Sequence, residues 1–332
     1  MALRIGTRGS ALAVAQSTAV ARSLEAFGAD VELIEIKTSG DETAPKPETE
    51  DKARFVKELE QALLTEEIDL AVHSAKDVPS ELLDGLEIVA VPERADPRDA
   101  LCLAPHLAAA GSADGPAGAQ PTPSDDGAPR HSLAARPLDL LPEGAVVGTA
   151  SLRRRAELLA LRPDLQIREL RGHVDTRLGK LADGEFDAIV LAAAGLARLG
   201  RAGEGVPLPE LSLVPAAGQG CLALEARSGD DATRKLACRL TDPHAFACVT
   251  AERMVTMALG ATCNTPVGAH ARIVNHSFIE LNVFVGTPDG KRWVRDDVRG
   301  MAEDPRSVGL DAANRLTAAG APDILAAAER MS

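Results

Sequence analysis

The sequence predicts an α/β protein with mostly parallel sheets and a smaller α+β region toward the C-terminal end. In the first half of the chain, short apolar segments of strand length alternate with amphipathic stretches of helical period. Such alternation with short connections is typical of parallel sheets covered by helices. The chain has 332 residues, more than one hydrophobic core usually serves, so we expect two or three domains.

The first α/β unit is predicted from four apolar segments and two helical stretches. Its expected strands are 3–6, 31–36, 68–73 and 86–91, and its expected helices are 11–27 and 55–64. The polar segment between them, 38–51, contains two prolines and should be a loop. Residues 105–137 are rich in Ala, Gly, Pro, Ser and Asp, and predict a flexible insertion because they could bury little apolar surface.

A second α/β unit is expected to start near Leu138. Its predicted strands and helices are 145–148, 151–161, 165–170, 174–181 and 188–191. The third region should be α+β, since a helix precedes alternating segments that suggest antiparallel strands. Its predicted elements are the helix 250–259, the strands 270–274, 278–286 and 292–298, and a mostly helical end from 305 to 331.

Composition excludes several kinds of partner. The net charge is −13, which disfavours general binding to DNA or to membranes. Aromatic residues make up 2% of the chain and tyrosine is missing, which argues against recognition of nucleic acids by base stacking. The sequence contains no apolar run of about 18 residues, so we expect no membrane span, and a signal peptide is not expected either.

The five cysteines predict reduced thiols in the cytoplasm. They form no Cys-x-x-Cys pair and no metal-ligand spacing, so we expect neither a metal site nor a disulfide framework. Cys263 lies in a loop, where a cysteine can be a nucleophile. A small buried apolar role is the commoner alternative.

Residues 148–155 predict an anion site. A short apolar strand leads into Thr149 and Ser151, either of which can cap a new helix, and into three consecutive arginines. A capped helix N-terminus beside arginines suits a carboxylate or phosphate, although a solvated basic helix start is the alternative. Side chains on successive helical residues point about 100° apart. Two adjacent arginines can therefore straddle one ligand while the third faces elsewhere.

Other polar side chains follow the predicted strands. Ser74, Lys76 and Asp77 come directly after one strand, where Asp77 is either a turn residue or a carboxylate facing a cationic intermediate. Five further polar residues come after the ends of other predicted strands: Arg8, Ser10, Arg171, Arg177 and Arg198. Ligands of open α/β sheets bind outside the carboxyl ends of the strands, so these groups could line one cleft, or they could be scattered on the surface.

Taken in order, these clusters resemble the porphobilinogen deaminase (hydroxymethylbilane synthase) family of tetrapyrrole biosynthesis. The resemblance covers almost the whole chain outside 105–137. It is carried by residues 6–10 (GTRGS), 71–79 (AVHSAKDVP), 96–100 (DPRDA), 147–154 (VGTASLRR), 170–178 (LRGHVDTRL), 217–220 (AGQG) and 250–253 (TAER).

The resemblance implies three domains, of which the first two are similar to the lobes of periplasmic binding proteins and enclose the active cleft. The implied boundaries are 1–104 with 221–240 for domain 1, 138–217 for domain 2 and 241–332 for domain 3. The third domain would carry the cofactor. We expect a monomer, as in the family.

The resemblance also implies a reaction. Members of the family condense four porphobilinogen molecules head to tail, with loss of ammonia, into the linear tetrapyrrole hydroxymethylbilane on a covalent dipyrromethane primer. Cys263 matches the cysteine that holds the dipyrromethane through a thioether. Asp77 matches the catalytic aspartate, which holds pyrrole N–H groups and stabilises positive charge as ammonia leaves and the azafulvene forms.

The other implied site residues bind the carboxylates of the pyrroles. The cofactor residues matched are Ser74, Lys76, Thr149, Ser151, Arg153, Arg154, Arg171 and Gly172. The substrate residues matched are Arg8, Ser10, Gln16, Arg177, Arg198 and Gln219. Arg155 lies outside the family motif, in agreement with the helix-angle argument.

Two other functions remain open. A non-catalytic anion-binding module would bind a ligand without turnover, and a divergent paralogue would act on a related pyrrole. The second is motivated by departures from the family pattern, which usually has two glycines before the cysteine, where this chain has Ala261 and Thr262. In the predicted lid loop, Glu48, Glu50 and Asp51 stand where the family is rich in glycine.

Overall fold

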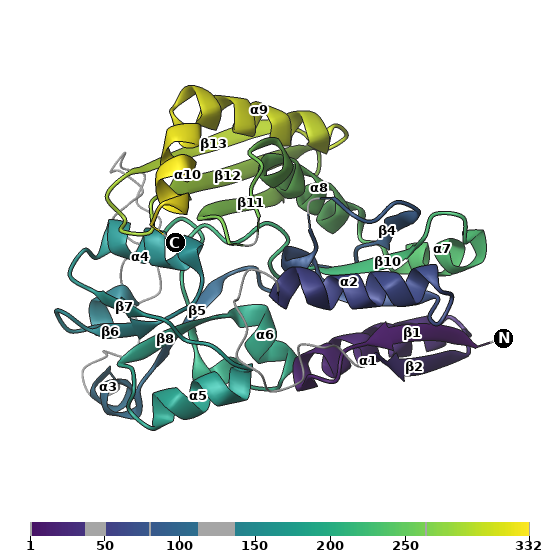
Figure 1. Cartoon of the computed structure of the whole chain (residues 1–332), viewed down its shortest axis with the longest axis horizontal. Helices are drawn as coiled ribbons and strands as arrows, with labels where there is room; N and C mark the ends of the chain where they lie inside the picture. The colour runs from purple at the N-terminus through teal and green to yellow at the C-terminus, as the bar shows by residue number, and fades with distance from the viewer. Residues whose placement is uncertain (1, 37–50, 80, 112–136, 263, 332) are drawn as a thin grey trace.

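The structure is a computed structural model that describes residues 2–36, 51–79, 81–111, 137–262 and 264–331. Its elements form three units, each built on one sheet (Figure 1). Two five-stranded sheets lie side by side in the lower half of Figure 1, and a three-stranded sheet with its helices lies above them. The predicted fold class, two α/β lobes with a small α+β C-terminal part, is confirmed.

The first sheet has the strand order β2-β1-β3-β10-β4. Strand β1 is parallel to β2 and β3, whereas β10 runs antiparallel between β3 and β4. The helices α1, α2 and α7 accompany this sheet (Figure 1). The bounds are β1 Leu3–Thr7, α1 Ala11–Glu25, β2 Val31–Glu35, α2 Asp51–Leu64, β3 Leu70–Ser74, β4 Leu86–Ala90, β10 Leu222–Arg227 and α7 Asp231–Ala237.

The second sheet has the order β7-β6-β8-β5-β9 and a similar design. Strand β6 is parallel to β7 and β8, and β5 runs antiparallel between β8 and β9. Each sheet thus contains an antiparallel strand from another part of the chain. The bounds are β5 Asp99–Leu103, α3 Pro105–Gly111, β6 Val146–Gly148, α4 Leu152–Leu161, β7 Gln166–Arg168, α5 Val174–Ala182, β8 Ala188–Ala192, α6 Ala193–Arg198 and β9 Val206–Pro207.

The structure corrects two expected boundaries. Residues 99–103, expected in the first domain, form β5 of the second sheet, so the end at 104 was placed too late. The segment crosses over because its buried apolar residues pair with β8. Residues 105–111, expected in the flexible insertion, form helix α3, which starts with proline and packs Leu107 against the second core. Residues 112–136 of the predicted insertion and residues 38–50 of the predicted loop 38–51 lie outside the described residues.

The third unit is an antiparallel sheet, β11-β12-β13, covered by three helices. Helices α8 and α9 begin alike, because Asp242 and Asp304 accept hydrogen bonds from the first turn and proline follows each of them. The helical end predicted as one stretch is broken at Gly320, whose φ is 93°. The bounds are α8 Pro243–Ala258, β11 Val267–Val274, β12 Phe278–Gly286, β13 Trp293–Met301, α9 Pro305–Ala318 and α10 Ala321–Glu329.

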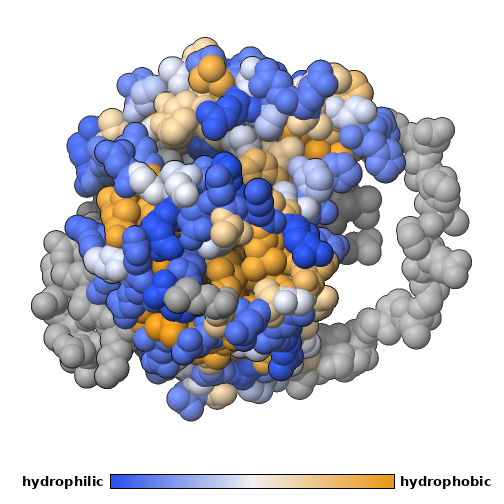
Figure 2. All heavy atoms as spheres, turned by 90° about the vertical axis from the view of Figure 1, so that its right-hand side faces the viewer, coloured by the Kyte–Doolittle hydropathy of each residue, from blue (hydrophilic) through white to orange (hydrophobic). Residues whose placement is uncertain are grey.

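The surface on the side of the first sheet mixes hydrophilic side chains with smaller apolar areas (Figure 2). Among the described helices, none combines the length and the hydropathy that crossing a membrane requires.

Helices α8 and α9 pack closely at Gly309, and the stability of the protein should depend on this contact. A Cβ at position 309 would lie 2.3 Å from the carbonyl oxygen of Ala251 and 2.7 Å from the Cβ of Met254. We expect Gly309→Ala to lower the free energy of unfolding by about 1–3 kcal/mol through overpacking. The measurement is urea denaturation.

Gly179 in α5 is the matched control, because a Cβ there meets nothing within 4 Å. Gly179→Ala should stabilise the protein by about 0.5–1 kcal/mol, since alanine loses less backbone entropy in a helix. Equal effects of the two substitutions would contradict the close packing of α8 on α9.

Candidate active site

Two backbone segments connect the five-stranded sheets, and polar side chains gather where they cross. Residues 91–98 run from β4 to β5, and residues 208–221 run from β9 back to β10. The ends of β3 and β6 lead to the same region, and half of the predicted site residues lie at these strand ends or in the second crossing segment.

The turn that carries Asp77 follows the buried strand β3. It is a single 3-10 turn, η2 (Ala75–Asp77), tied to the second crossing by a hydrogen bond from the Ala75 amide to the Cys221 carbonyl. Asp77 is half-buried. Arg177 of the second unit lies close enough to feel its charge: burial and Arg154 lower the pKa of Arg177, and Asp77 partly offsets them. That the two side chains act on one ligand stays a prediction.

Gln219 connects the two units beside this turn. Lys76 Nζ donates to Gln219 Oε1 at 3.2 Å, and Gln219 Nε2 donates to the Pro97 carbonyl at 2.7 Å and to Asp99 Oδ1 at 2.9 Å. Gln219 is 1% exposed. The residue next to Asp77 is therefore joined through one buried amide to the first residue of β5.

Asp99 binds the two arginines that begin α4. Arg153 Nη1 lies 2.7 Å from Asp99 Oδ2, and Arg154 Nη2 lies 2.7 Å from Asp99 Oδ1. Asp99 is fully buried, which alone would raise its pKa, but Arg153 and Arg154 outweigh burial and hold the pKa far below its usual range. Arg153 Nη1 also donates a hydrogen bond to Glu157 Oε2 at 3.1 Å. Burial raises the pKa of Glu157 to about 8.

The start of α4 has the predicted cap but places the arginines differently from expectation. Ser151 Oγ accepts from the Arg154 amide at 3.4 Å, and Thr149 Oγ1 accepts from the Ser151 amide at 3.1 Å. Arg153 and Arg154 are 4% and 6% exposed and hold a protein carboxylate, where an open cleft wall was expected. Their role toward cofactor carboxylates stays a prediction. Arg155 turns away from them and donates to the Pro288 carbonyl.

The other predicted arginines have fewer acidic partners. Arg177 Nε donates to the Gly172 carbonyl at 2.7 Å, and Arg198 Nη2 donates to the Gly220 carbonyl at 2.7 Å. Burial lowers the pKa of both, so an incoming carboxylate would relieve an unfavourable charge. Arg171 is exposed and pairs with Glu169. Arg198 ends helix α6, an element that the sequence did not predict.

The N-terminal residues of the predicted site lie at the start of α1. Ser10 caps this helix by accepting from the Ala13 amide at 3.3 Å, and α1 contacts α6, the helix that carries Arg198. Gln16 is 5% exposed, and its Nε2 has no acceptor among the described residues. Arg8 and Ser74 are half-buried at the ends of β1 and β3.

The predicted cofactor cysteine, Cys263, lies outside the described residues. Two threonines order the residues around it: the Thr262 amide donates to Thr265 Oγ1 at 2.8 Å, and the Asn264 amide donates to Thr262 Oγ1 at 3.3 Å. Ala261 is buried in the core of the third unit. The departures from the family pattern therefore have structural roles, as a core methyl group and as loop hydrogen bonds.

Comparisons with known proteins give matches over most of the chain. Residues 3–235 match the family model described as "Porphobilinogen deaminase, dipyromethane cofactor binding domain", and residues 246–318 match its C-terminal domain. The chain belongs to the porphobilinogen deaminase family. The porphobilinogen deaminases of Brevibacillus brevis and Thermus thermophilus are each 43% identical to it, covering 97% of this chain and 96% and 97% of theirs.

Solved structures that the chain is similar to include solute-binding proteins. An ancestral cationic amino acid binding protein gives a TM-score of 0.40 at 13% identity, covering 72% of this chain and 87% of its own. A periplasmic substrate-binding protein from Coxiella burnetii gives 0.39 at 14% identity, covering 76% and 96%.

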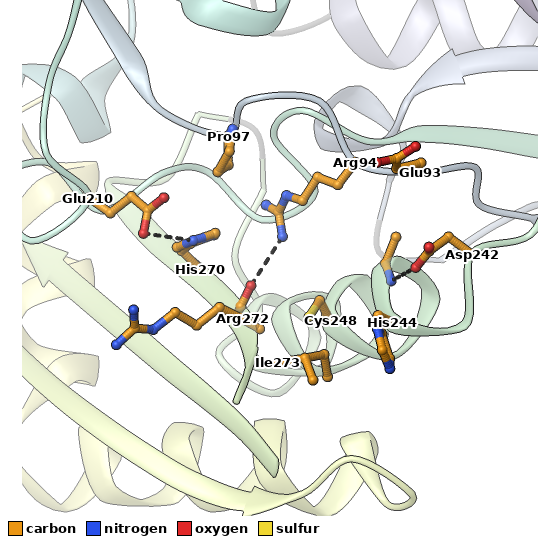
Figure 3. A pocket seen from close by; sticks show the side chains of 12 residues that line it. Glu93, Arg94, Pro97, Glu210, Asp242, His244, Cys248, His270, Arg272 and Ile273 are labelled. Atoms are coloured by element: carbon orange, nitrogen blue, oxygen red, sulfur yellow. Dashed lines mark hydrogen bonds and ion pairs between the residues drawn. The ribbon is translucent and has the colours of Figure 1, made fainter. Parts of the chain in front are cut away.

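Sequence reasoning missed a second buried charge cluster in this member of the porphobilinogen deaminase family. Glu252 of α8 is 0% exposed and accepts from Arg94 Nη1 at 2.6 Å and from the Gly218 and Ala271 amides. It therefore joins both crossing segments to the third unit. His270 lies between Glu252 and Glu210. Together with Glu210 it lines a pocket of about 400 Å³ (Figure 3).

Two signals could have found these residues. Asp99 and Glu252 both lie within segments that carry the family resemblance, 96–100 and 250–253. Glu252 lies within the predicted helix 250–259, and Asp99 precedes the apolar residues 100–104, which were not assigned to an element. A carboxylate in such apolar surroundings needs a cationic partner. Their partners are more than fifty residues away in the chain, so the pairs themselves could not be read from local spacing.

The Asp99 cluster predicts a large effect on stability. Asp99→Asn would leave two buried guanidinium groups without their carboxylate, and breaking such a pair typically costs about 3–5 kcal/mol of unfolding free energy. Urea denaturation measures the loss. Asp164→Asn is the control, because its ion pair with Arg162 lies near the surface and should matter much less. Similar losses in the two variants would contradict the buried network.

His270 predicts a pH-dependent contribution to stability. Burial alone would lower the pKa of His270, but the carboxylates of Glu210 and Glu252, at 3.3 and 3.5 Å from its two ring nitrogens, outweigh it and raise the pKa. The stabilisation is thus complete below the unfolded pKa of about 6.5 and is lost as pH rises through the higher folded value.

The measurement is the difference in unfolding free energy between the parent protein and His270→Gln. This difference should shrink from about pH 6 to about pH 9. His276→Gln, at an exposed turn, serves as control and should show little change over the same range. A difference that grows with pH would show that the bridge does not involve the imidazolium.

Proposed function

We propose that this chain condenses porphobilinogen into hydroxymethylbilane, with Asp77 as the catalytic carboxylate. The observation that supports the proposal is the position of Asp77 on the turn after β3, where its neighbour Lys76 is joined through Gln219 to Asp99 at the start of β5 in the second sheet. Membership of the porphobilinogen deaminase family supplies the reaction. A site with one carboxylate facing basic side chains suits a substrate that develops positive charge on a ring bearing two carboxylates.

Asp77 acts on the substrate directly in this proposal. When ammonia leaves porphobilinogen, positive charge spreads over the pyrrole ring and its N–H group. A carboxylate about 4 Å away, at an effective dielectric constant near 20, interacts with a unit charge by roughly 4 kcal/mol before desolvation. That energy corresponds to about a thousandfold in rate. The carboxylate also accepts the pyrrole N–H and so fixes the ring orientation.

The basic side chains hold the acetate and propionate groups. Arg177 and Arg198 suit this role, because burial lowers the pKa of both and a bound carboxylate would offset that cost. Lys76 adds a charge beside Asp77, and Gln219 orients it. Substrate-side roles are proposed on the same grounds of position for Arg8, Ser10 and Gln16, at the α1 end of the site.

The residues present suit a dipyrromethane cofactor. Arg153 Nε is a buried donor with no acceptor among the described residues, and a ligand with four carboxylates can use such a donor. The family cofactor supplies a covalent primer on which pyrroles are assembled. We propose that Cys263 holds it and that Ser74, Thr149, Ser151, Arg153, Arg154, Arg171 and Gly172 orient its carboxylates. The proposal includes a monomeric enzyme in the cytoplasm, as the family resemblance implies.

The test is Asp77→Asn, which removes the charge and keeps the size. We expect kcat to fall by about a thousandfold, with the thermal midpoint nearly unchanged because Asp77 is half-buried at a turn. Consumption of porphobilinogen measures the rate. Asp84→Asn, on the turn before β4, is the control and should keep full activity.

Intact mass of the purified protein tests the cofactor separately. Expression in a host that makes tetrapyrroles should give a dipyrromethane adduct that Cys263→Ala lacks. Ligand binding without turnover, and without need of Asp77, would favour the anion-binding module. An adduct of another mass would favour the divergent paralogue.

A further inference from the structure

Helix α8 of the third unit holds the turn that follows Asp77. Arg253 Nη1 donates to the Val78 carbonyl at 3.1 Å, and Arg253 Nη2 donates to the Pro79 carbonyl at 2.6 Å. These two carbonyls belong to the two residues that directly follow Asp77. One guanidinium group therefore fixes the exit of the turn from a different unit of the fold.

Apolar packing reinforces this contact. Val78 and Ala75, on either side of Asp77, share a buried cluster with Ala245 and Val249 of α8. The helix thus touches the turn through both side chains and backbone. Burial lowers the pKa of Arg253, and the Glu225 carboxylate of β10 counters it.

Glu225 also anchors the strand that enters the turn. Its Oε2 lies 2.9 Å from Nε2 of His73, and both side chains are buried. His73 belongs to β3 and precedes Asp77 by four residues. The backbone around Asp77 is therefore tied down before the turn by His73 and after it by Arg253, with Glu225 acting on both.

The turn needs such support because little holds it locally. It is one 3-10 turn of three residues, closed by a long hydrogen bond of 3.4 Å from the Val78 amide to the Ala75 carbonyl. Ser74 stands at its N-cap position but makes no capping hydrogen bond to it. A short turn of this kind places a side chain well only when its surroundings fix it.

We propose that Arg253 is a positioning residue for the reaction, which holds the Asp77 carboxylate in its productive place through the Val78 and Pro79 carbonyls. The third unit then serves catalysis in a second way, besides carrying the proposed cofactor cysteine. This inference rests on the proposed role of Asp77.

The experiment compares Arg253→Met and Arg253→Lys in the cofactor-loaded enzyme. Small misplacements of a catalytic group can cost up to about a hundredfold, so we expect kcat of Arg253→Met to fall by about 10- to 100-fold. KM should stay within about threefold, because substrate carboxylates bind elsewhere. Arg253→Lys keeps one donor and should recover part of the rate, with a loss of about three- to tenfold.

Arg227 provides the matched control. Its Nη1 donates to the carbonyls of Leu63 and Ile68, both at 2.7 Å, in the same unit as Asp77. Arg227→Met removes the same kind of contact, together with ion pairs to Asp69 and Asp230, from a part of the unit that the proposal does not use. It should lower the thermal midpoint but keep kcat within about twofold.

The inference is overturned if kcat of Arg253→Met falls no further than that of Arg227→Met, or if KM alone changes. If Arg253→Met does not fold, the kcat of Arg253→Lys is compared with that of Arg227→Lys. An unchanged kcat in Arg253→Lys then overturns the inference. Full activity of Asp77→Asn would reject the role of Asp77. An inactive Asp77→Asn with a fully active Arg253→Met would reject the role of Arg253 alone.

Discussion

The arrangement of the site depends on one buried carboxylate, that of Asp99. It is reached by Arg153, Arg154 and Gln219, so a single side chain at the start of β5 links α4 to the crossing segment before β10. Through Gln219 the link extends to Lys76, the neighbour of Asp77. Among the described residues the two lobes share no strand, so these contacts connect them at the place where the substrate is proposed to bind.

Much of the fold was readable from the sequence because local patterns determine it. Strands β1 to β4 and the three strands of the third unit follow from apolar periodicity, and Ser151 caps α4 as its residue type predicts. Asp77 and Arg177 could be expected at one site because both follow strand ends. Pattern reading failed at β5 and at α6, which are short and adjoin other elements.

The charged partners could not be read in the same way. Three consecutive arginines near a helix start look like an exposed anion site, and the distinction depends on whether a carboxylate reaches them from elsewhere. Asp99 does so across more than fifty residues, and Glu252 reaches Arg94 across a still longer separation. Local spacing carries no trace of such contacts, because they exist only once the sheets have formed. The buried pairs are the part of the site for which the three-dimensional structure was necessary.

The position of β10 has a consequence for the synthesis of the protein. This strand lies between β3 and β4, and among the described residues it is the one sheet neighbour of β4. It is synthesised after all the strands of the second sheet. During synthesis the first sheet therefore lacks β10 until the residues of the second sheet have been made. The second lobe, whose strands span β5 to β9, can close first. Once the second lobe has folded, residues 208–221 lead the chain back to the first lobe, where β10 completes the sheet. We therefore expect the second lobe to fold before the first, although the first is synthesised earlier.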